Sequence, residues 1–195
     1  MAILANQAAG FLNTGNVPQR QGNSHPSLAP YQDFPTADGT MLLAIGNDGQ
    51  FKRFCDAADH PEWAQDTRFA SNTLRVHNRA ALIPAMEAVT RTRSTADWVQ
   101  LLEDKAVPCG PINTIGQAFA DPQVVARGLA VAQPRDAGDG ITAITGVASP
   151  LRLVGNPPVL RRAPPALGQH TEEVLAEMGL DTAAIAALRA QGVVG

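Results

Sequence analysis

Two prolines enclose a cysteine and a glycine at Pro108-Cys109-Gly110-Pro111, a little past the middle of the 195-residue chain. Proline inside a helix removes a backbone hydrogen bond and clashes with the preceding turn, so Val107–Ile112 is not helical. We interpret this segment as a linker. The interpretation predicts an α/β chain in three parts: a helix end at 1–15, a small α/β domain at 16–105, and the linker with a C-terminal segment at 106–195.

Hydrophobic spacing predicts the elements of the first two parts. A continuous apolar run at Thr40–Ile45 is typical of a buried strand. The helix expected after it carries Phe51, Phe54 and Cys55 at i, i+3 and i+4, which places them on one inner face. Prolines and polar residues predict a loop over Asn16–Pro35. Further helices are expected at Ile3–Leu12, at Gly49–Ala58 behind an Asn47-Asp48 cap, in a short turn from His60, at Asn72–Thr92 with a bend near Pro84, and behind Ser94 or Thr95 with Trp98, Leu101 and Leu102 on its apolar stripe.

The last part of the chain mixes helices with a strand pair. Thr114–Ala126 is predicted to be helical with an interruption at Asp121-Pro122. Two strands are expected at Leu129–Gln133 and Ile141–Val147, around a turn at 137–140. The chain is predicted to end in two helices capped at Thr171 and Asp181.

Composition excludes several classes of function. The net charge of −3 gives no basic field for nucleic acid or an anionic membrane. No apolar run approaches the length of a membrane span, and the N-terminus lacks the pattern of a signal peptide. With only Cys55 and Cys109, neither a disulfide framework nor a zinc site is indicated. The expectation is a cytoplasmic protein without a metal.

Three phrases occur in order and together span most of the chain: Gly22-Asn23-Ser24-His25-Pro26 with Pro30-Tyr31, then Pro108-Cys109-Gly110-Pro111, then Arg162-Ala163-Pro164-Pro165-Ala166-Leu167-Gly168-Gln169-His170-Thr171. Together they resemble the C-terminal half of the family III CoA-transferases, the CaiB/BaiF group that includes formyl-CoA transferase and carnitine CoA-transferase. The resemblance implies a small α/β domain followed by the C-terminal return segment of a larger domain.

The same resemblance implies the chemistry of the intact enzyme. An aspartate carries CoA as a thioester between two carboxylic acids, so acyl-CoA and an acceptor acid are substrates and no cofactor is permanently bound. The family's nucleophilic aspartate lies in an N-terminal half that no segment here matches. We therefore assign no catalytic residue and no CoA-binding residue to this chain, and expect the chain alone to be inactive. Family members are homodimers, which implies self-association.

The strongest candidate site is the loop formed by Gly22, Asn23, Ser24, His25 and Pro26. The family places a loop at this position over the CoA thioester, where it excludes water and directs donors at a developing oxyanion. His25 is the candidate donor to a thioester oxygen or a carboxylate. The competing interpretation is a surface turn stiffened by prolines, in which His25 bonds to local backbone.

Several alternatives stay open. Asn-Ser-His-Pro stands where formyl-CoA transferase has glycines, which argues against an oxalate or formate enzyme and favours the carnitine-like or the uncharacterised branches of the family. An α-methylacyl-CoA racemase with the same fold, or a non-catalytic relic, are the other candidates. The carboxylates nearest the loop are interpreted as turn and cap residues (Asp33, Asp38 and Asp48), the two thiols as structural, and the Arg161-Arg162 pair as solvated rather than bound to a CoA phosphate.

Overall fold

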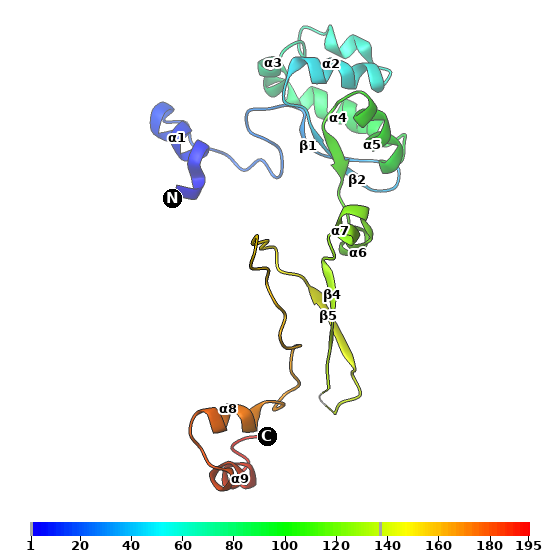
Figure 1. The fold of residues 1–195 in the computed structure, drawn as a ribbon. Coiled ribbons are helices and arrows are strands. Elements are labelled where there is room, and N and C mark those ends of the chain that lie inside the picture. Colours follow the sequence, from blue (N-terminus) through cyan, green and yellow to red (C-terminus); the bar gives the residue numbers. More distant parts are fainter. Residues whose placement is uncertain (1, 137) are drawn as a thin grey trace. The chain divides into compact units, whose positions relative to one another are not determined.

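The computed structural model describes residues 2–136 and 138–195. It divides into two compact units, one that ends at Ile112 and one that begins at Asn113 (Figure 1). Within the described residues, no helix combines the length and the apolar character needed to cross a membrane. The predicted division after residues 15 and 105 stays a prediction.

The first unit is a mixed α/β fold, as expected. The helices predicted around residues 3–12, 49–58 and 95–104 are confirmed, as are the short turn at Pro61 and the strand at residue 40. The elements are η1 (Ala2–Leu4), α1 (Ala5–Thr14), β1 (Tyr31–Pro35), β2 (Thr40–Ala44), α2 (Asp48–Ala57), η2 (Pro61–Ala64), α3 (Asn72–His77), α4 (Arg79–Thr90), α5 (Thr95–Asp104) and β3 (Cys109–Pro111).

The sheet of this unit is antiparallel in the order β1-β2-β3. Two predictions are wrong here. Tyr31–Pro35 is a strand rather than the end of a loop, and Cys109–Pro111 is a strand rather than part of a linker, with Cys109 opposite Leu43. Both strands lie at a sheet edge, where proline is tolerated because one side of the strand needs no ladder hydrogen bond.

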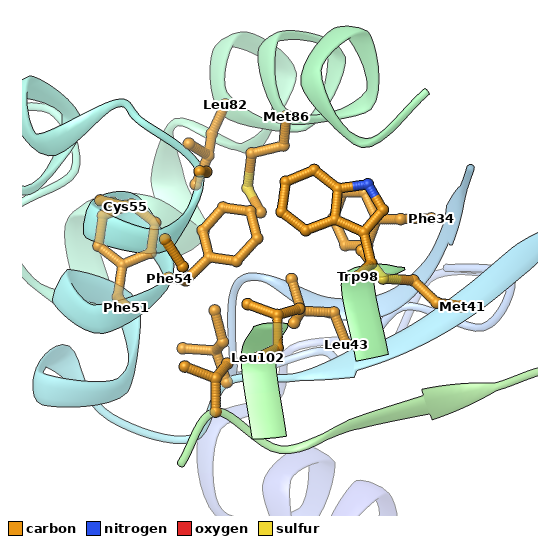
Figure 2. Packing of buried hydrophobic residues seen from close by; sticks show 14 of the residues in the cluster. Phe34, Met41, Leu43, Phe51, Phe54, Cys55, Leu82, Met86, Trp98 and Leu102 are labelled. Carbon is orange, nitrogen blue, oxygen red and sulfur yellow. The ribbon is translucent and has the colours of Figure 1, made fainter. Parts of the chain in front are cut away.

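The core lies between one face of this sheet and the helices (Figure 2). Met41 and Leu43 are fully buried, whereas Leu42 between them is 41% exposed, as alternation along a strand requires. The predicted inner face of α2 is confirmed, since Phe51, Phe54 and Cys55 are all buried. The Trp98 indole N–H also finds a partner, donating to the Thr90 carbonyl at 2.7 Å.

Asn78 separates α3 from α4, where the sequence predicted one helix bent near Pro84. The side-chain amide of Asn78 donates to the carbonyls of Arg68 at 3.1 Å and Leu74 at 2.9 Å. Asparagine competes in this way with the helical hydrogen bonds of the backbone. Pro84 instead lies inside α4. The predicted position of the bend is therefore wrong, because the amide and not the proline ends the first helix.

The second unit contains a two-stranded antiparallel sheet and four short helices among its described residues. The interruption at Asp121 is confirmed, because its carboxylate caps the next helix through the N–H groups of Gln123 and Val124. Thr171 begins a helix without capping it, which corrects its predicted role. Ala137, in the expected turn, lies outside the described residues. The elements are α6 (Ile115–Ala120), α7 (Pro122–Ala126), β4 (Ala130–Pro134), β5 (Ala143–Val147), α8 (Thr171–Glu177) and α9 (Thr182–Ala190).

Candidate functional site

The candidate loop leads directly into β1. Gly22 takes a left-handed conformation with φ of 61°, which glycine adopts without strain. Gly22, Asn23 and Pro26 are exposed, whereas Ser24 and His25 are half-buried. The loop thus presents a small polar surface of backbone and short side chains.

Two contacts fold the loop back along the strand that follows it. The backbone N–H of His25 donates to the carbonyl of Tyr31 at 2.9 Å. The Ser24 hydroxyl donates to the side-chain oxygen of Gln32 at 3.1 Å. The His25 and Tyr31 rings also lie with their centroids 5.3 Å apart. His25 is therefore held beside the first residue of β1 by both its backbone and its ring.

The imidazole of His25 has its hydrogen-bonding roles fixed by the next turn of backbone. The N–H of Ser27 lies 3.1 Å from His25 Nδ1 and can only donate, so Nδ1 accepts and the neutral ring carries its proton on Nε2. Within the part of the chain that the structure describes, Nε2 has no hydrogen-bond partner. The local backbone contact and the donor role, which the sequence set against each other, are thus compatible.

Three side chains from α3 and α4 bind the backbone of the loop and of the residues that follow it, at positions 25 to 29, and sequence reasoning missed all of them. We call them the loop clamp: Asn72, Arg75 and Arg79. In the single helix that the sequence predicted over Asn72–Thr92, their spacing of i, i+3 and i+7 would place them on one face, and the buried Leu82 and Met86 continue that spacing. The polar residues at the start of this otherwise apolar stripe were the signal from which the loop clamp could have been predicted.

Arg75 is the buried member of the loop clamp. It is fully buried and donates to the carbonyls of Ala29 at 2.7 Å and Phe69 at 3.0 Å, and to the Asp48 carboxylate at 2.8 Å. Its guanidinium also lies 4.4 Å from the centroid of the Phe51 ring. With these contacts all made inside the fold, Arg75 acts as a structural link between loop, α2 and α3.

Asn72 and Arg79 hold the loop at its tip. The Asn72 amide donates to Ser27 O at 2.8 Å, and its oxygen accepts from the N–H of Ala29 at 3.1 Å. Arg79 Nη2 donates to the carbonyls of His25 and of Leu28, the latter at 2.8 Å. Burial lowers the pKa of Arg79, although an arginine side chain stays charged in proteins.

Asp38 and Asp48, two of the three carboxylates near the loop in sequence, have hydrogen-bond partners inside the fold. Asp38 accepts from the N–H of Thr95 at 2.8 Å and from its hydroxyl at 3.0 Å, and these bonds hold the pKa of Asp38 below its usual value. Asp48 pairs with Arg75. The interpretation of Asp33 as a turn residue is wrong, because Asp33 lies in β1 opposite Leu42. The interpretation of Asp48 as a helix cap is wrong, because it is the first helical residue and Asn47 caps the helix.

The two thiols are poor nucleophiles. Burial raises the pKa of Cys55 to about 12 and also raises the pKa of Cys109, so both are protonated near neutral pH. In the second unit, Arg162 pairs with Glu173 at 2.5 Å instead of standing free. Among residues 2–136 and 138–195, no group of three or more His, Cys, Asp or Glu side chains is placed to hold a metal ion.

Known proteins place this chain in context. Residues 1–171 match the family model described as CoA-transferase family III. The chain is 44% identical over 177 residues to the succinate–glutarate CoA-transferase of Agrobacterium fabrum, covering 91% of this chain and 44% of that protein. It is 37% identical to the human succinyl-CoA:glutarate CoA-transferase, covering 100% of this chain and 44% of that protein.

Solved structures agree with the sequence relatives. The chain resembles a CAIB/BAIF family protein from Brucella suis with a TM-score of 0.77 and 39% identity, covering 91% of this chain and 45% of that one. This chain spans less than half the length of each of these three proteins.

Proposed function

This chain belongs to CoA-transferase family III, and on that premise we propose that it supplies the loop-bearing part of an enzyme that moves CoA between carboxylic acids. The observation that carries the proposal is the Gly22–Pro26 loop with a histidine whose Nε2–H is left as a donor. The names of the similar proteins support CoA transfer as the reaction.

The proposed reaction proceeds through an enzyme aspartate. The aspartate attacks the acyl-CoA carbonyl and displaces the CoA thiolate, which leaves a mixed anhydride. The thiolate then attacks the aspartyl carbonyl and releases the donor acid, which leaves an aspartyl-CoA thioester. The acceptor carboxylate repeats these two steps in reverse and departs as its CoA thioester. Water must be kept out while the anhydride exists, since hydrolysis would waste the acyl group.

We assign the loop the task of covering the thioester. A donor such as His25 Nε2–H strengthens its hydrogen bond as charge develops on the carbonyl oxygen, which lowers the barrier. A half-buried imidazole held at its backbone and at Nδ1 loses little freedom when it makes that bond. The support is the geometry of Ser24, His25 and Ser27, together with the exposure of the loop.

The proposed substrates are short dicarboxylic acids and their CoA thioesters. Two of the similar proteins are named for succinate or succinyl-CoA together with glutarate. These names favour dicarboxylates over the carnitine-like substrates that the loop sequence suggested. We further propose that the nucleophile comes from outside this chain, that the complete enzyme is a cytoplasmic homodimer, and that this chain alone transfers no CoA.

A chimera tests the proposal. In the Agrobacterium fabrum enzyme, the segment that this chain matches is replaced by this chain, and the product is incubated with succinyl-CoA and glutarate. The expected result is glutaryl-CoA and succinate, measured by chromatography, with little free CoA. A folded chimera that only hydrolyses succinyl-CoA, or that exchanges the α-proton of a 2-methylacyl-CoA instead, contradicts CoA transfer.

A further inference from the structure

We propose that Arg79 is a positioning residue for His25, acting through the backbone of the loop to fix which imidazole nitrogen carries the proton. The inference rests on the proposed function of the loop but adds a residue that lies on α4, more than fifty positions along the chain. Arg79 is not proposed to touch substrate.

Arg79 binds both ends of the four-residue segment 25–28, which begins with the histidine. Its Nη2 donates to the carbonyl of His25 at one end and to the carbonyl of Leu28 at the other. Both bonds come from one amino group, Nη2, whose two N–H bonds lie at a fixed angle in the guanidinium plane, so the two carbonyls are held at a set separation. The backbone from 25 to 28 is thereby held as a closed turn.

Ser27 is the residue that this turn orients. Its N–H donates to His25 Nδ1 at 3.1 Å, and its carbonyl accepts from the Asn72 amide at 2.8 Å. Asn72 in α3 therefore fixes the peptide plane that follows Ser27, while Arg79 in α4 fixes the planes at the His25 and Leu28 carbonyls, at the two ends of the segment. If the hydrogen bonds from Arg79 are lost, the Ser27 N–H rotates away from the ring and Nδ1 loses its donor. The neutral imidazole can then carry its proton on either nitrogen.

The charge and the burial of Arg79 agree with this role. Its Nη1 is buried and has no hydrogen-bond partner within the described residues. Arg79 is half-buried, and burying charged nitrogens is costly. The two carbonyls that it does bind are those of His25, in the candidate loop, and of Leu28, just after the loop. Lysine at this position would keep the charge, but its ammonium N–H donors rotate and are not fixed in a plane.

The test measures the His25 tautomer in the 195-residue chain itself. The ¹⁵N chemical shifts of the imidazole at a pH where the ring is neutral report which nitrogen is protonated, and His25→Gln assigns the signals. Wild type is expected to show the Nε2–H form. Arg79→Met is expected to show a mixture of both forms, together with faster amide exchange at Ser27. Arg79→Lys is expected to lie between the two.

Arg53→Met is the matched control. Arg53 also donates to two backbone carbonyls, those of Lys105 at 2.8 Å and Ala106 at 3.0 Å, but within the described residues it makes no hydrogen bond to the loop. Near-ultraviolet circular dichroism of Trp98 verifies that each variant keeps its core. If Arg79→Met unfolds the chain, Arg79→Lys and Asn72→Ala provide the same comparison. Asn72→Ala removes the hydrogen bond to the Ser27 carbonyl.

Kinetics in the chimera give the second readout. Arg79→Met is expected to lower kcat by about 10- to 100-fold with a change in KM below about threefold, the pattern of a misplaced group rather than lost substrate binding. A wild-type tautomer and unchanged amide exchange in the Arg79 variants overturn the inference. An inactive chimera with Arg79 intact instead contradicts the proposed function, while the tautomer measurement still decides the role of Arg79.

Discussion

Arg75 Nη2 lies 2.8 Å from Asp48 Oδ1, although the arginine side chain is fully buried and the aspartate side chain is 57% exposed. Arg75 and Asp48 therefore contribute unequally to the stability of the fold. Water can replace the arginine at Asp48, but nothing replaces it at the carbonyls of Ala29 and Phe69. The link between the loop and the helices thus depends on the arginine far more than on the carboxylate.

The first prediction follows from that inequality. Arg75→Ala leaves two buried carbonyls without a donor and is expected to lower the free energy of unfolding by about 2–4 kcal/mol. Asp48→Asn is expected to cost below about 1 kcal/mol, since an exposed partner contributes little. Urea unfolding of both variants measures the difference. Equal losses would contradict the assignment of Arg75 as the structural link.

A second prediction concerns Asp38 and acid. Its pKa is lowered, first by the hydrogen bond from the Thr95 N–H, so the ionised carboxylate stabilises the fold. That contribution is present above the ordinary aspartate pKa and is lost as the pH falls through the lowered one. Asp38→Asn is therefore expected to flatten the decline of unfolding free energy between about pH 5 and pH 2.

The control for Asp38 is Glu103→Gln in α5. Glu103 is exposed, and its carboxylate makes no hydrogen bond within the described residues. This variant should keep the acid dependence of wild type. An identical dependence in Asp38→Asn would show that the bonds to Thr95 do not stabilise the ionised form.

The third prediction concerns the thiols. Because burial raises the pKa values of Cys55, to about 12, and of Cys109, neither is expected to react readily with a thiol reagent at neutral pH in the folded chain. Both should react after unfolding. Absorbance of the released thiolate counts the reactive groups. Rapid labelling of folded Cys109 would contradict the interpretation of this thiol as structural.

The fourth prediction concerns His25 in the chimera. His25→Ala removes the proposed donor and is expected to lower turnover about 100-fold, while free CoA from hydrolysis increases relative to transfer. His77→Ala, at an exposed histidine in α3, is the matched control. If the two variants turn over and partition alike, His25 has only a structural role.

Much of the fold could be predicted from sequence because its signals are local. The stripe of Phe51, Phe54 and Cys55 and the cap at Ser94 each depend on residues close together in the chain, and both are present. The strand at Cys109 could not be predicted in this way. Its pairing with Leu43 joins residues far apart in sequence, and its prolines are tolerated only because β3 is an edge strand.

The same distinction, between local signals and contacts far apart in the sequence, applies to the candidate site. The loop was found from its phrase, and the possible bond from His25 to local backbone was foreseen. The loop clamp was not, because Arg79 reaches back to His25 and Leu28 across more than fifty residues. A charged side chain on a helix is usually a solvated one, so only the fold reveals that this one is directed inward.

The most direct test of the account is to locate the CoA thioester. The chimera is incubated with succinyl-CoA, the adduct is trapped with hydroxylamine, and the labelled peptide is identified by mass spectrometry. The account predicts a hydroxamate on one aspartate of the relative's own portion and none on this chain. Labelling at Asp33, Asp38 or Asp48, or at any other carboxylate of this chain, would contradict it.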